Sequence, residues 1–478
     1  MSSKIINSVG IDVGTTTTQV IFSSLELMNI AAPTQVPRFE FVDRKILYES
    51  KISFTPINSD GTIDDKNLWK MILNEYDTAG FDIKTVETGA IIITGETSKA
   101  KNAKTTLMQL ASDLGDFVVA TAGPHLESII AGRGSGSAAY SEEHTATVLN
   151  IDVGGGTSNY VVFRNGKVID TCCLNVGGRL IQTDAAGSVT KITEPAKKIL
   201  TSVIPNYKEG YTTLSTNDLR LVCDQMASLI VECMEGNNVS PLAKSLLQTN
   251  PFKQSYSFDA VSLSGGIGKT YYEIDEAADD KFQYLDLGIL LAESLLKNEK
   301  LKKQNVVKPN QTIRATVIGA GAYTLSLSGS TIWLTVNNLP LRNIPVLHPH
   351  FDWSDTNSSL SDGIEEAART MDISLSNDDY AIYLSEEMPV TYKAVQKSAS
   401  ELIKIFKKYR SENNLPAIVL SFNDIGKVLG MELAPELKSH PLAIIDEVIV
   451  YEGDYIDIGK SYFGGEIVPL TIKSLAFP

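Results

Sequence analysis

Two aspartates in this chain each precede a short turn made of glycine and threonine. Asp12 stands in the segment VGIDVGTTTTQVIF, residues 9–22, and Asp152 stands in VLNIDVGGGTSNYVVF, residues 148–163. Glycine lets the backbone bring its N–H groups close to an anion, and a threonine hydroxyl adds a further donor. A hydrated magnesium ion keeps several waters and takes only one or two carboxylates, so one aspartate beside each turn suits it. These residue types therefore favour the binding of magnesium and phosphate.

Apolar runs flank both turns, so each segment predicts a β-hairpin. A single copy could be a turn and nothing more, because Asp and Gly between alternating strands are the ordinary hairpin signal. The second aspartate, however, follows the first by 140 residues (152 − 12). We therefore expect two similarly folded lobes that each offer one turn to a shared nucleotide. The residues expected at its phosphates are Gly14, Thr15, Thr16, Thr17, Gly154, Gly155, Gly156 and Thr157, and the expected metal ligands are Asp12 and Asp152.

Two further glycine pairs follow predicted strands. Gly265 and Gly266 come directly after the apolar run 261–264, where they could open a helix and let an adenosine lie on bare backbone. Gly177 and Gly178 follow the predicted strand 167–174. For this second pair, a simple turn and a passage of the chain under the nucleotide explain the residues equally well.

The order of these elements carries a resemblance. Two phosphate hairpins, Glu127 on a helix between them and a Gly-Gly element after them resemble the actin-like ATPase superfamily of sugar kinases, actins and heat-shock chaperone ATPases. Within it, the chain length and the tail segment EGDYIDIG, residues 452–459, resemble the family of ethanolamine ammonia-lyase reactivating factors. The resemblance implies ATP and Mg²⁺ as cofactors and ethanolamine ammonia-lyase, with its cobalamin, as the partner. It also implies that lobe movement opens this enzyme, so that damaged cobalamin leaves and intact adenosylcobalamin enters.

Glu127 has two interpretations. It could be a solvent-facing glutamate near the first turn of a helix, where the helix dipole favours a negative charge. It could instead orient the attacking water, or act as a general base, opposite the γ-phosphate. The resemblance favours the second interpretation, because Glu127 occupies the matching position between the two hairpins. We therefore expect Glu127 to be catalytic, together with Asp12 and Asp152.

The predicted fold is α/β, with a two-lobed actin-like (ribonuclease H-like) ATPase core and an additional C-terminal α/β domain. We expect lobe I over residues 1–140, with an inserted subdomain at about 31–85, lobe II over 141–329 and the C-terminal domain over 330–478. In this interpretation residues 318–329 form a second connecting helix. Its small residues would let it cross the first connector closely near Ala131 and Gly132, forming a hinge that couples hydrolysis to lobe rotation.

Composition restricts the partners and the compartment. The chain has 478 residues and a formal charge of −15, which argues against nucleic acid and anionic membranes as partners. It has no apolar run of roughly 18 residues and no signal-peptide pattern, so we expect a cytoplasmic protein. Association with an ethanolamine-utilisation bacterial microcompartment and homo-oligomerisation both stay open.

The cysteines and one histidine pair suggest other chemistry only weakly. The cysteines show no CxxC spacing and are expected to be buried small side chains; they are Cys172, Cys173, Cys223 and Cys233. His348 and His350 suggest a metal or cobalamin site, but without a third ligand a structural or surface role is the better interpretation.

Three other functions remain open at this point. A small-molecule kinase of the same fold would need a catalytic aspartate that faces a second pocket. An activator ATPase of the 2-hydroxyacyl-CoA dehydratase type would need interfacial cysteines for an iron–sulfur cluster. A non-enzymatic, filament-forming scaffold would show nucleotide-dependent sedimentation instead.

Overall fold

The computed structural model describes most of the chain. The described residues are 3–14, 17–29, 39–51, 53–58, 60–86, 88–93, 101–114, 117–121, 123–205, 207, 213–236, 238–273, 280–309, 322–327, 332–336, 339, 341–353, 358–410, 415–438, 440–459 and 469–474. Thr15 and Thr16 of the first turn lie outside these ranges.

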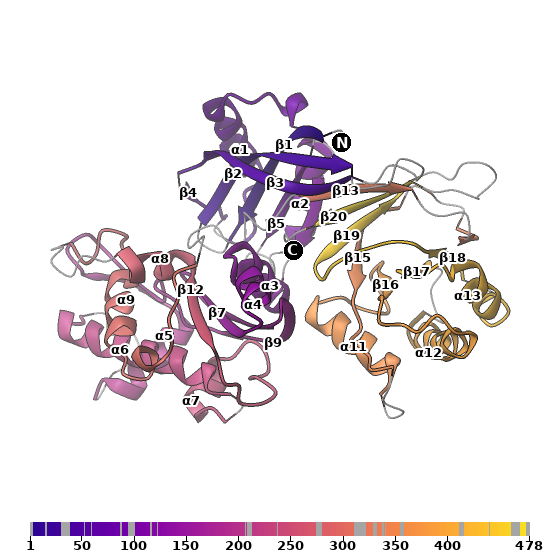
Figure 1. Ribbon diagram of the computed structural model, residues 1–478. Coiled ribbons are helices and arrows are strands. Elements are labelled where there is room, and N and C mark those ends of the chain that lie inside the picture. The colour runs from indigo at the N-terminus through magenta and orange to yellow at the C-terminus, as the bar shows by residue number, and fades with distance from the viewer. Residues whose placement is uncertain are drawn as a thin grey trace.

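The first lobe is built on one mixed sheet with the order β3-β2-β1-β5-β6 (Figure 1). Its first three strands are antiparallel, and the two strands beyond β1 are parallel to it. The strands are β1 (Ser3–Val13), β2 (Thr17–Asn29), β3 (Phe39–Glu49), β5 (Thr88–Ile93) and β6 (Phe117–Thr121), with the short β4 (Ser53–Phe54) paired to β2. The helical elements are α1 (Asp65–Ala79), η1 (Ile83–Thr85) and α2 (Ala103–Leu114). This strand order is that of a ribonuclease H-like lobe.

Helix α1 shows why the described residues of the expected insertion belong to lobe I. Asp64 caps the helix by accepting from Asn67 N, and Gly80 ends it in the left-handed conformation. Leu68, Ile72 and Tyr76 recur every fourth residue, so they share one face and lie in the same core as Val9 and Phe22 of the sheet. Strand β3 likewise pairs with β2. Residues 39–51 and 60–80 thus extend the sheet and core of lobe I and form no core of their own.

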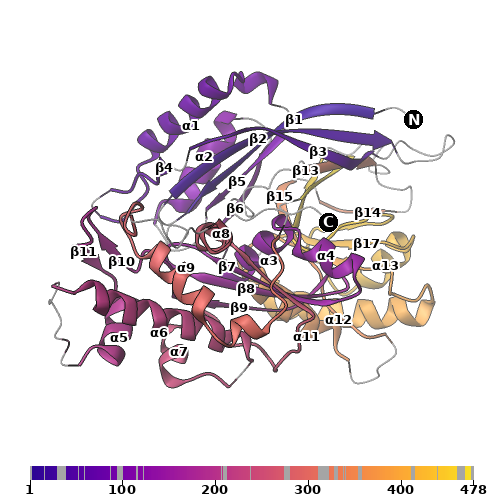
Figure 2. The same cartoon turned by 60° about the vertical axis from the view of Figure 1, so that its left-hand side comes forward.

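The second lobe repeats this plan with the order β12-β7-β8-β9. Its strands are β7 (Thr147–Val153), β8 (Ser158–Arg164), β9 (Lys167–Leu174) and β12 (Ala260–Ser264), with the separate hairpin β10 (Ile181–Thr183) and β11 (Val189–Ile192). Val306 bridges Val261 in the parallel direction, at the place that a fifth strand would take. The helical elements are α5 (Glu194–Val203), α6 (Thr216–Met234), α7 (Pro241–Leu246), α8 (Gly265–Glu273), α9 (Gly288–Lys297) and η3 (Leu301–Lys303). The predicted two-lobed fold is confirmed; Figure 2 shows lobe I above the helices of lobe II.

The four cysteines are buried and free, as the sequence predicted. Three of them, Cys172, Cys223 and Cys233, belong to the core of lobe II. No disulfide constrains them, and they behave as small apolar side chains.

Two helices connect the lobes, α3 (Pro124–Gly134) and α4 (Ser137–Glu143). Helix α3 carries apolar residues on several faces because other parts of the chain surround it. Ile129 packs in a cluster on β8 and β9, whereas Leu126 and Ile130 belong to the core of the C-terminal domain. A Cβ at Gly132 would lie only 2.7 Å from the Phe163 ring, so the absence of a side chain lets α3 approach β8 closely. The close crossing predicted between Gly132 and residues 318–321 involves residues outside the described ranges.

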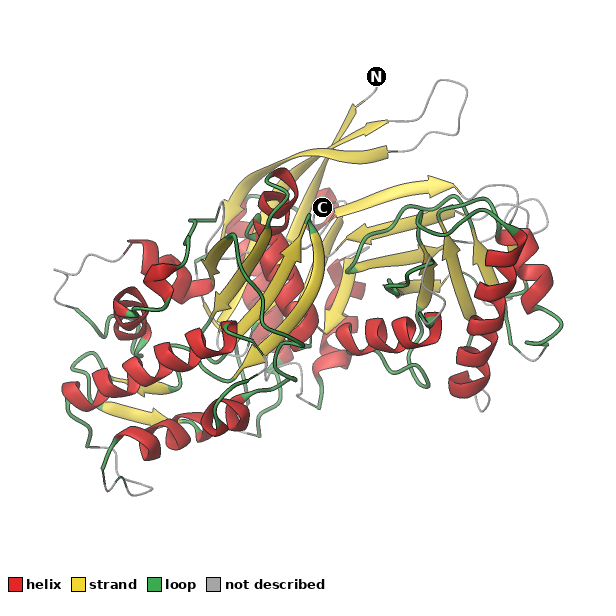
Figure 3. Ribbon diagram, turned by 60° about the horizontal axis from the view of Figure 1, so that its bottom comes forward, coloured by secondary structure: helices red, strands yellow, loops and turns green. Residues whose placement is uncertain are grey.

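The C-terminal domain is a mixed sheet with the order β13-β20-β19-β15-β16-β17-β18-β14. Its strands are β13 (Ala322–Leu327), β14 (Trp333–Leu334), β15 (Leu341–Leu347), β16 (Ala381–Leu384), β17 (Ala417–Ser421), β18 (Leu442–Ile445), β19 (Asp454–Ile458) and β20 (Pro469–Ser474). Helices α11 (Leu360–Thr370), α12 (Tyr392–Arg410) and α13 (Gly426–Leu433) form a layer against the sheet (Figure 3).

The predicted second connecting helix over 318–329 is wrong for its described part. Residues 322–327 form strand β13, which pairs with β20 and lies beside β3 of lobe I. The reason lies in the periodicity: Tyr323, Leu325 and Leu327 alternate with Thr324 and Ser326, a period of two that favours a strand. Residues 318–321 lie outside the described ranges.

Candidate nucleotide-binding site

The two glycine turns have the same local structure. Gly14 N donates to Thr17 O at 3.0 Å, and Gly154 N donates to Thr157 O at 2.9 Å. These partners are again 140 residues apart (154 − 14 and 157 − 17), like the two aspartates. Closure uses the first glycine N–H of each turn, so this N–H is not available to a ligand.

An amide side chain stands opposite each aspartate. Asp12 is paired with Gln19 across the first hairpin, and Asp152 with Asn159 across the second. Directly opposite residues in an antiparallel pair project on the same face of the sheet. Gln19 Oε1 and Asn159 Oδ1 are buried side-chain atoms without a hydrogen-bond partner among the described residues. Such orphaned polar atoms beside both carboxylates are what a missing ligand would satisfy.

A chain of hydrogen bonds holds Asp152 in lobe II. Ser264 Oγ donates to Asp152 Oδ2 at 2.7 Å, and Asn150 Nδ2 donates to Ser264 Oγ at 3.0 Å. Ser264 faces Asp152 because β12 and β7 are parallel and in register there. Burial raises the pKa of Asp152 to about 6, although the Ser264 hydrogen bond opposes this rise. A cation beside the carboxylate would favour its charged form and so offset the cost of burying it.

The glycines divide into those that the fold requires and those that it does not. Gly265 has φ of +80°, and an added Cβ would meet Val153 O at 2.5 Å. A Cβ at Gly177 would meet the backbone of Gly155 at 2.6 Å. By contrast, Cβ atoms at Gly156 and Gly266 would meet no heavy atom within 4 Å. Bare backbone at these two positions leaves room for a ligand.

The segment at Gly177 and Gly178 supports the second turn directly. Gly178 N donates to Gly154 O at 3.0 Å, and Arg179 N donates to Gly155 O at 2.6 Å. Gly178 also lies against Gly288 of α9, where a Cβ would meet Gly288 Cα at 2.9 Å. The pair is therefore part of the packing under the phosphate turn, and its contact with a nucleotide stays a prediction.

Arg179 joins this segment to lobe I. Its guanidinium carbon lies 4.8 Å from the centroid of the Phe54 ring, and its Nη1 lies 3.9 Å from Asp286 Oδ2. Phe54 is the cross-strand partner of Thr17, which ends the first turn. The two hairpins are thereby brought to the same junction between the lobes. Neither Arg179 nor Phe54 was a predicted site residue, because only the folded chain brings them together.

Glu127 lies in the first turn of α3, which starts from the same sheet edge as the Asp12 turn. Val13, Ile93 and Thr121 are in register across the parallel strands β1, β5 and β6. Their carboxyl ends therefore share one edge, with β6 about 10 Å from β1 at the usual strand spacing. Glu127 is half-buried there. Its predicted role at the γ-phosphate is compatible with this position and stays a prediction.

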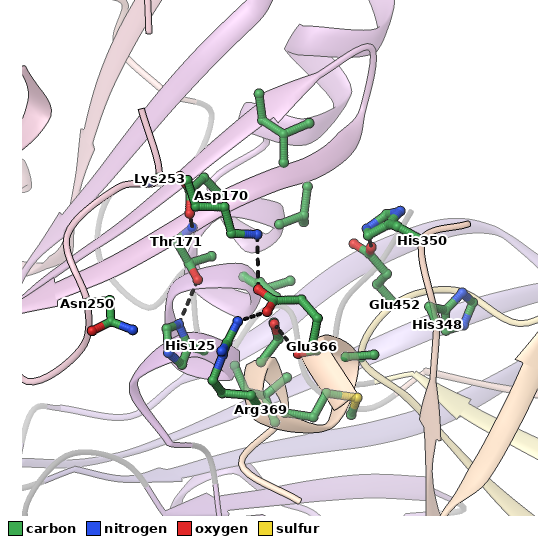
Figure 4. Close-up of a pocket in the computed structure, with 18 of the residues that line it drawn as sticks. His125, Asp170, Thr171, Asn250, Lys253, His348, His350, Glu366, Arg369 and Glu452 are labelled. Atoms are coloured by element: carbon green, nitrogen blue, oxygen red, sulfur yellow. Dashed lines mark hydrogen bonds and ion pairs between the residues drawn. The ribbon is translucent and has the colours of Figure 1, made fainter. Parts of the chain in front are cut away.

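A separate cavity of about 160 Å³ lies between α3, β9 and the C-terminal domain (Figure 4). Ion pairs line this cavity: Lys253 contacts Glu366 at 3.0 Å, and His350 contacts Glu452 at 3.1 Å. Burial lowers the pKa of His348 to about 4. Among the described residues no group of three or more His, Cys, Asp or Glu side chains could hold a metal ion.

The comparison with known families identifies the chain. Residues 4–478 match the family described as "Ethanolamine utilisation protein EutA". The chain belongs to the EutA family. It is 48% identical, over 478 residues and the full length of both chains, to the ethanolamine ammonia-lyase reactivase EutA of Salmonella typhimurium. It is 47% identical, again over both full lengths, to the protein of that name from Escherichia coli.

Solved structures are similar to about two thirds of this chain, and only at low identity. The Ppx/GppA phosphatase of Aquifex aeolicus has a TM-score of 0.39 and 14% identity, covering 66% of this chain and 98% of the phosphatase. The ethanolamine utilisation protein EutJ of Carboxydothermus hydrogenoformans has a TM-score of 0.33 and 15% identity, covering 66% of this chain and 89% of EutJ. The strand orders of the two sheets define the actin-like fold of this EutA family member. Within its described residues, no helix is both long and apolar enough to cross a lipid bilayer.

Proposed function

We propose that this EutA family member is an ATP-dependent reactivating factor for ethanolamine ammonia-lyase. Magnesium ATP binds between the lobes, with Asp12 and Asp152 toward the hydrated ion and the two turns around the phosphates. Gly265 and Gly266 face the adenosine. The observation that carries this proposal is the matched pair of closed turns, each with its aspartate and its unpartnered amide oxygen, 140 residues apart.

The described residues fit a magnesium nucleotide. Two carboxylates at equivalent positions suit an ion that takes few protein ligands and keeps its waters. The orphaned oxygens of Gln19 and Asn159 can accept hydrogen bonds from such waters. When bound, the ion neutralises developing charge on the phosphates. The open space beside Gly156 can accommodate the phosphate chain, and the open space beside Gly266 can accommodate the adenosine.

Phosphoryl transfer needs positioning and charge stabilisation more than covalent chemistry. Ser264 and Asn150 hold the Asp152 carboxylate in one orientation. Glu127 orients the attacking water from the first turn of α3. The hairpins reside on different lobes, so a nucleotide bound to both turns links its own hydrolysis to the angle between the lobes.

The partner follows from the family. Both full-length relatives bear the name ethanolamine ammonia-lyase reactivase. We infer that lobe movement in this chain opens the same enzyme, so that cobalamin without its adenosyl group is released and adenosylcobalamin enters. We expect this to take place in the cytoplasm.

The buried cysteines argue against the alternative of an iron–sulfur activator. Cys172 and Cys173 lie in β9, and both are at most 1% exposed. A cluster between subunits needs thiolates at a surface, and these side chains cannot reach one without unfolding the strand.

The test is recovery of ethanolamine ammonia-lyase that has been inactivated with hydroxocobalamin. The assay contains the protein, magnesium, ATP and excess adenosylcobalamin. Asp152→Ala removes the proposed ligand, and Asp77→Ala, at an exposed position on α1, is the matched control. We expect recovery with the wild type and with Asp77→Ala, and none with Asp152→Ala. Hydrolysis of ATP without any recovery would leave the ATPase but overturn the reactivase assignment. Transfer of phosphate to a metabolite would favour the kinase instead.

A further inference from the structure

The C-terminal domain contacts α3 at both of its ends. This helix carries Glu127 in its first turn, so its orientation determines where that side chain lies. An ATPase core of two lobes needs no third domain for hydrolysis. The proposed function therefore does not explain why the C-terminal domain contacts both ends of α3.

The first contact is at the N-terminal end of α3. Gly123 is the N-cap residue and has no side chain to bond the first free N–H groups of the helix. The carboxylate of Asp372, which follows α11 in the C-terminal domain, occupies the space in which a Gly123 Cβ would stand. A negative charge at a helix N-terminus is stabilised by the helix dipole. The Asp372 carboxylate thus lies against the N-terminal end of α3, although it comes from another domain.

The second contact is at the C-terminal end of α3. Arg133 Nη2 lies 3.7 Å from Glu452 Oε2, and His350 Nε2 lies 3.1 Å from Glu452 Oε1. The Arg133 side chain is only 8% exposed. Burial alone would raise the pKa of Glu452, but the His350 hydrogen bond and the neighbouring positive charge hold it below its usual value. Arg133 Nε and Glu452 Oε2 have no hydrogen-bond partner within the described residues.

Apolar packing continues between these two contacts. Leu126 and Ile130 belong to the same buried cluster as Leu347, Ile364 and Tyr455 of the C-terminal domain. The other side of α3 packs on lobe II through Ile129 and Phe163. The helix is thus held between lobe II and the C-terminal domain over its whole length, and the cavity in Figure 4 lies along this seam.

We propose that the C-terminal domain positions α3, through Asp372 at one end and Glu452 at the other, and thereby sets the rate at which Glu127 supports ATP hydrolysis. Asp372 and Glu452 are positioning residues, since both act through the helix. A movement of the C-terminal domain, such as one that a bound partner protein would impose, changes the hydrolysis rate. The inference rests on the proposed ATP site.

The test compares steady-state ATP hydrolysis and nucleotide affinity in full-length variants. Asp372→Ala removes the carboxylate that lies against Gly123, and Asp372→Asn keeps its shape without the charge. Glu386→Gln, which changes an exposed carboxylate of the same domain, is the matched control. We expect kcat to fall by roughly 3- to 30-fold in Asp372→Ala, the range for mutations that alter coupling between sites. The Kd of Asp372→Ala for a fluorescent ATP analogue should equal that of the wild type. The kcat of Asp372→Asn should lie between those of the wild type and Asp372→Ala.

A second comparison separates positioning from general damage. In a Glu127→Gln background, Asp372→Ala should cause no further loss of kcat, because both changes remove one effect. If the kcat of the double variant falls by the product of the two single losses, the inference is contradicted. Equal kcat values for the wild type and Asp372→Ala would also contradict it. A wild type that binds and hydrolyses no ATP would overturn the proposed function and this inference with it. Active wild type with an unaffected Asp372→Ala would overturn this inference alone.

Discussion

The guanidinium of Arg179 in lobe II lies 4.8 Å from the centroid of the Phe54 ring in lobe I. Each residue is tied to one of the two glycine turns. Arg179 N donates to Gly155 O, and Phe54 pairs with Thr17 across two strands. The contact therefore reports whether the two turns are close together, and it must break if the lobes separate widely.

Removing this contact should weaken nucleotide binding. Phe54 is 60% exposed. A cation–π pair at an exposed site contributes about 0.5–1 kcal/mol, which corresponds to roughly 2- to 5-fold in Kd. We expect Arg179→Ala and Phe54→Ala each to raise the Kd for magnesium ATP within this range. Titration of both single variants and the double variant forms a thermodynamic cycle. The double variant should bind about as weakly as either single variant; fully additive losses would show that the contact is not shared.

Glu127→Gln should reduce hydrolysis while it preserves binding. Proton transfer or water orientation by a positioned side chain contributes about 100-fold or more to a rate. We expect kcat for ATP to fall by at least this factor, with a Kd within about twofold of wild type. Glu143→Gln, at an exposed position on the neighbouring α4, is the control and should leave kcat unchanged. A kcat equal to that of the wild type in Glu127→Gln would show that Glu127 has no role in hydrolysis.

Gly156→Ala and Gly177→Ala should differ in their effects on stability. Open space surrounds a Cβ at Gly156, so alanine there should leave the free energy of unfolding unchanged or raise it by up to about 1 kcal/mol. Its methyl group would nevertheless crowd a phosphate, and KM for ATP should rise. At Gly177 the added methyl meets the Gly155 backbone at 2.6 Å and should cost about 1–3 kcal/mol. Thermal denaturation without nucleotide and ATPase kinetics measure the two effects separately; unchanged kinetics in Gly156→Ala would argue against a phosphate at this turn.

His348 should make the protein sensitive to acid. Burial lowers its pKa to about 4, below the value near 6.5 of the unfolded chain. A lowered folded-state pKa contributes stability that is present above pH 6.5 and is lost as the pH falls toward 4, by at most about 3 kcal/mol. His348→Gln should therefore show a shallower loss of unfolding free energy between pH 7 and 5 in urea titrations. His144→Gln, at an exposed position, should follow the wild type. Equal slopes for all three proteins would contradict this assignment.

Local patterns predicted much of this structure. The two hairpins follow from apolar runs and turn residues within short segments. Strand β13 was missed because its resemblance to a connecting helix outweighed its two-residue period. The register of each hairpin could have indicated Gln19 and Asn159, since both stand seven residues after their aspartates.

Other site features depend on contacts between distant segments. Ser264 reaches Asp152 only because β12 lies parallel to β7, 112 residues apart in the chain. Arg179 and Phe54 meet only once both lobes have formed. Asp372 reaches Gly123 only through the docking of the C-terminal domain. Sequence periodicity contains no information on such pairs, because it describes one element at a time.

Isothermal titration with magnesium ATP tests the central claim, that both turns serve one nucleotide, most directly. The proteins to compare are the wild type, Asp12→Asn, Asp152→Asn and the double variant. We expect one nucleotide per wild-type chain, a large loss of magnesium-dependent affinity in each single variant, and little further loss in the double variant. Two nucleotides per chain, or losses that add in full, would show that the hairpins form independent sites and would contradict the account.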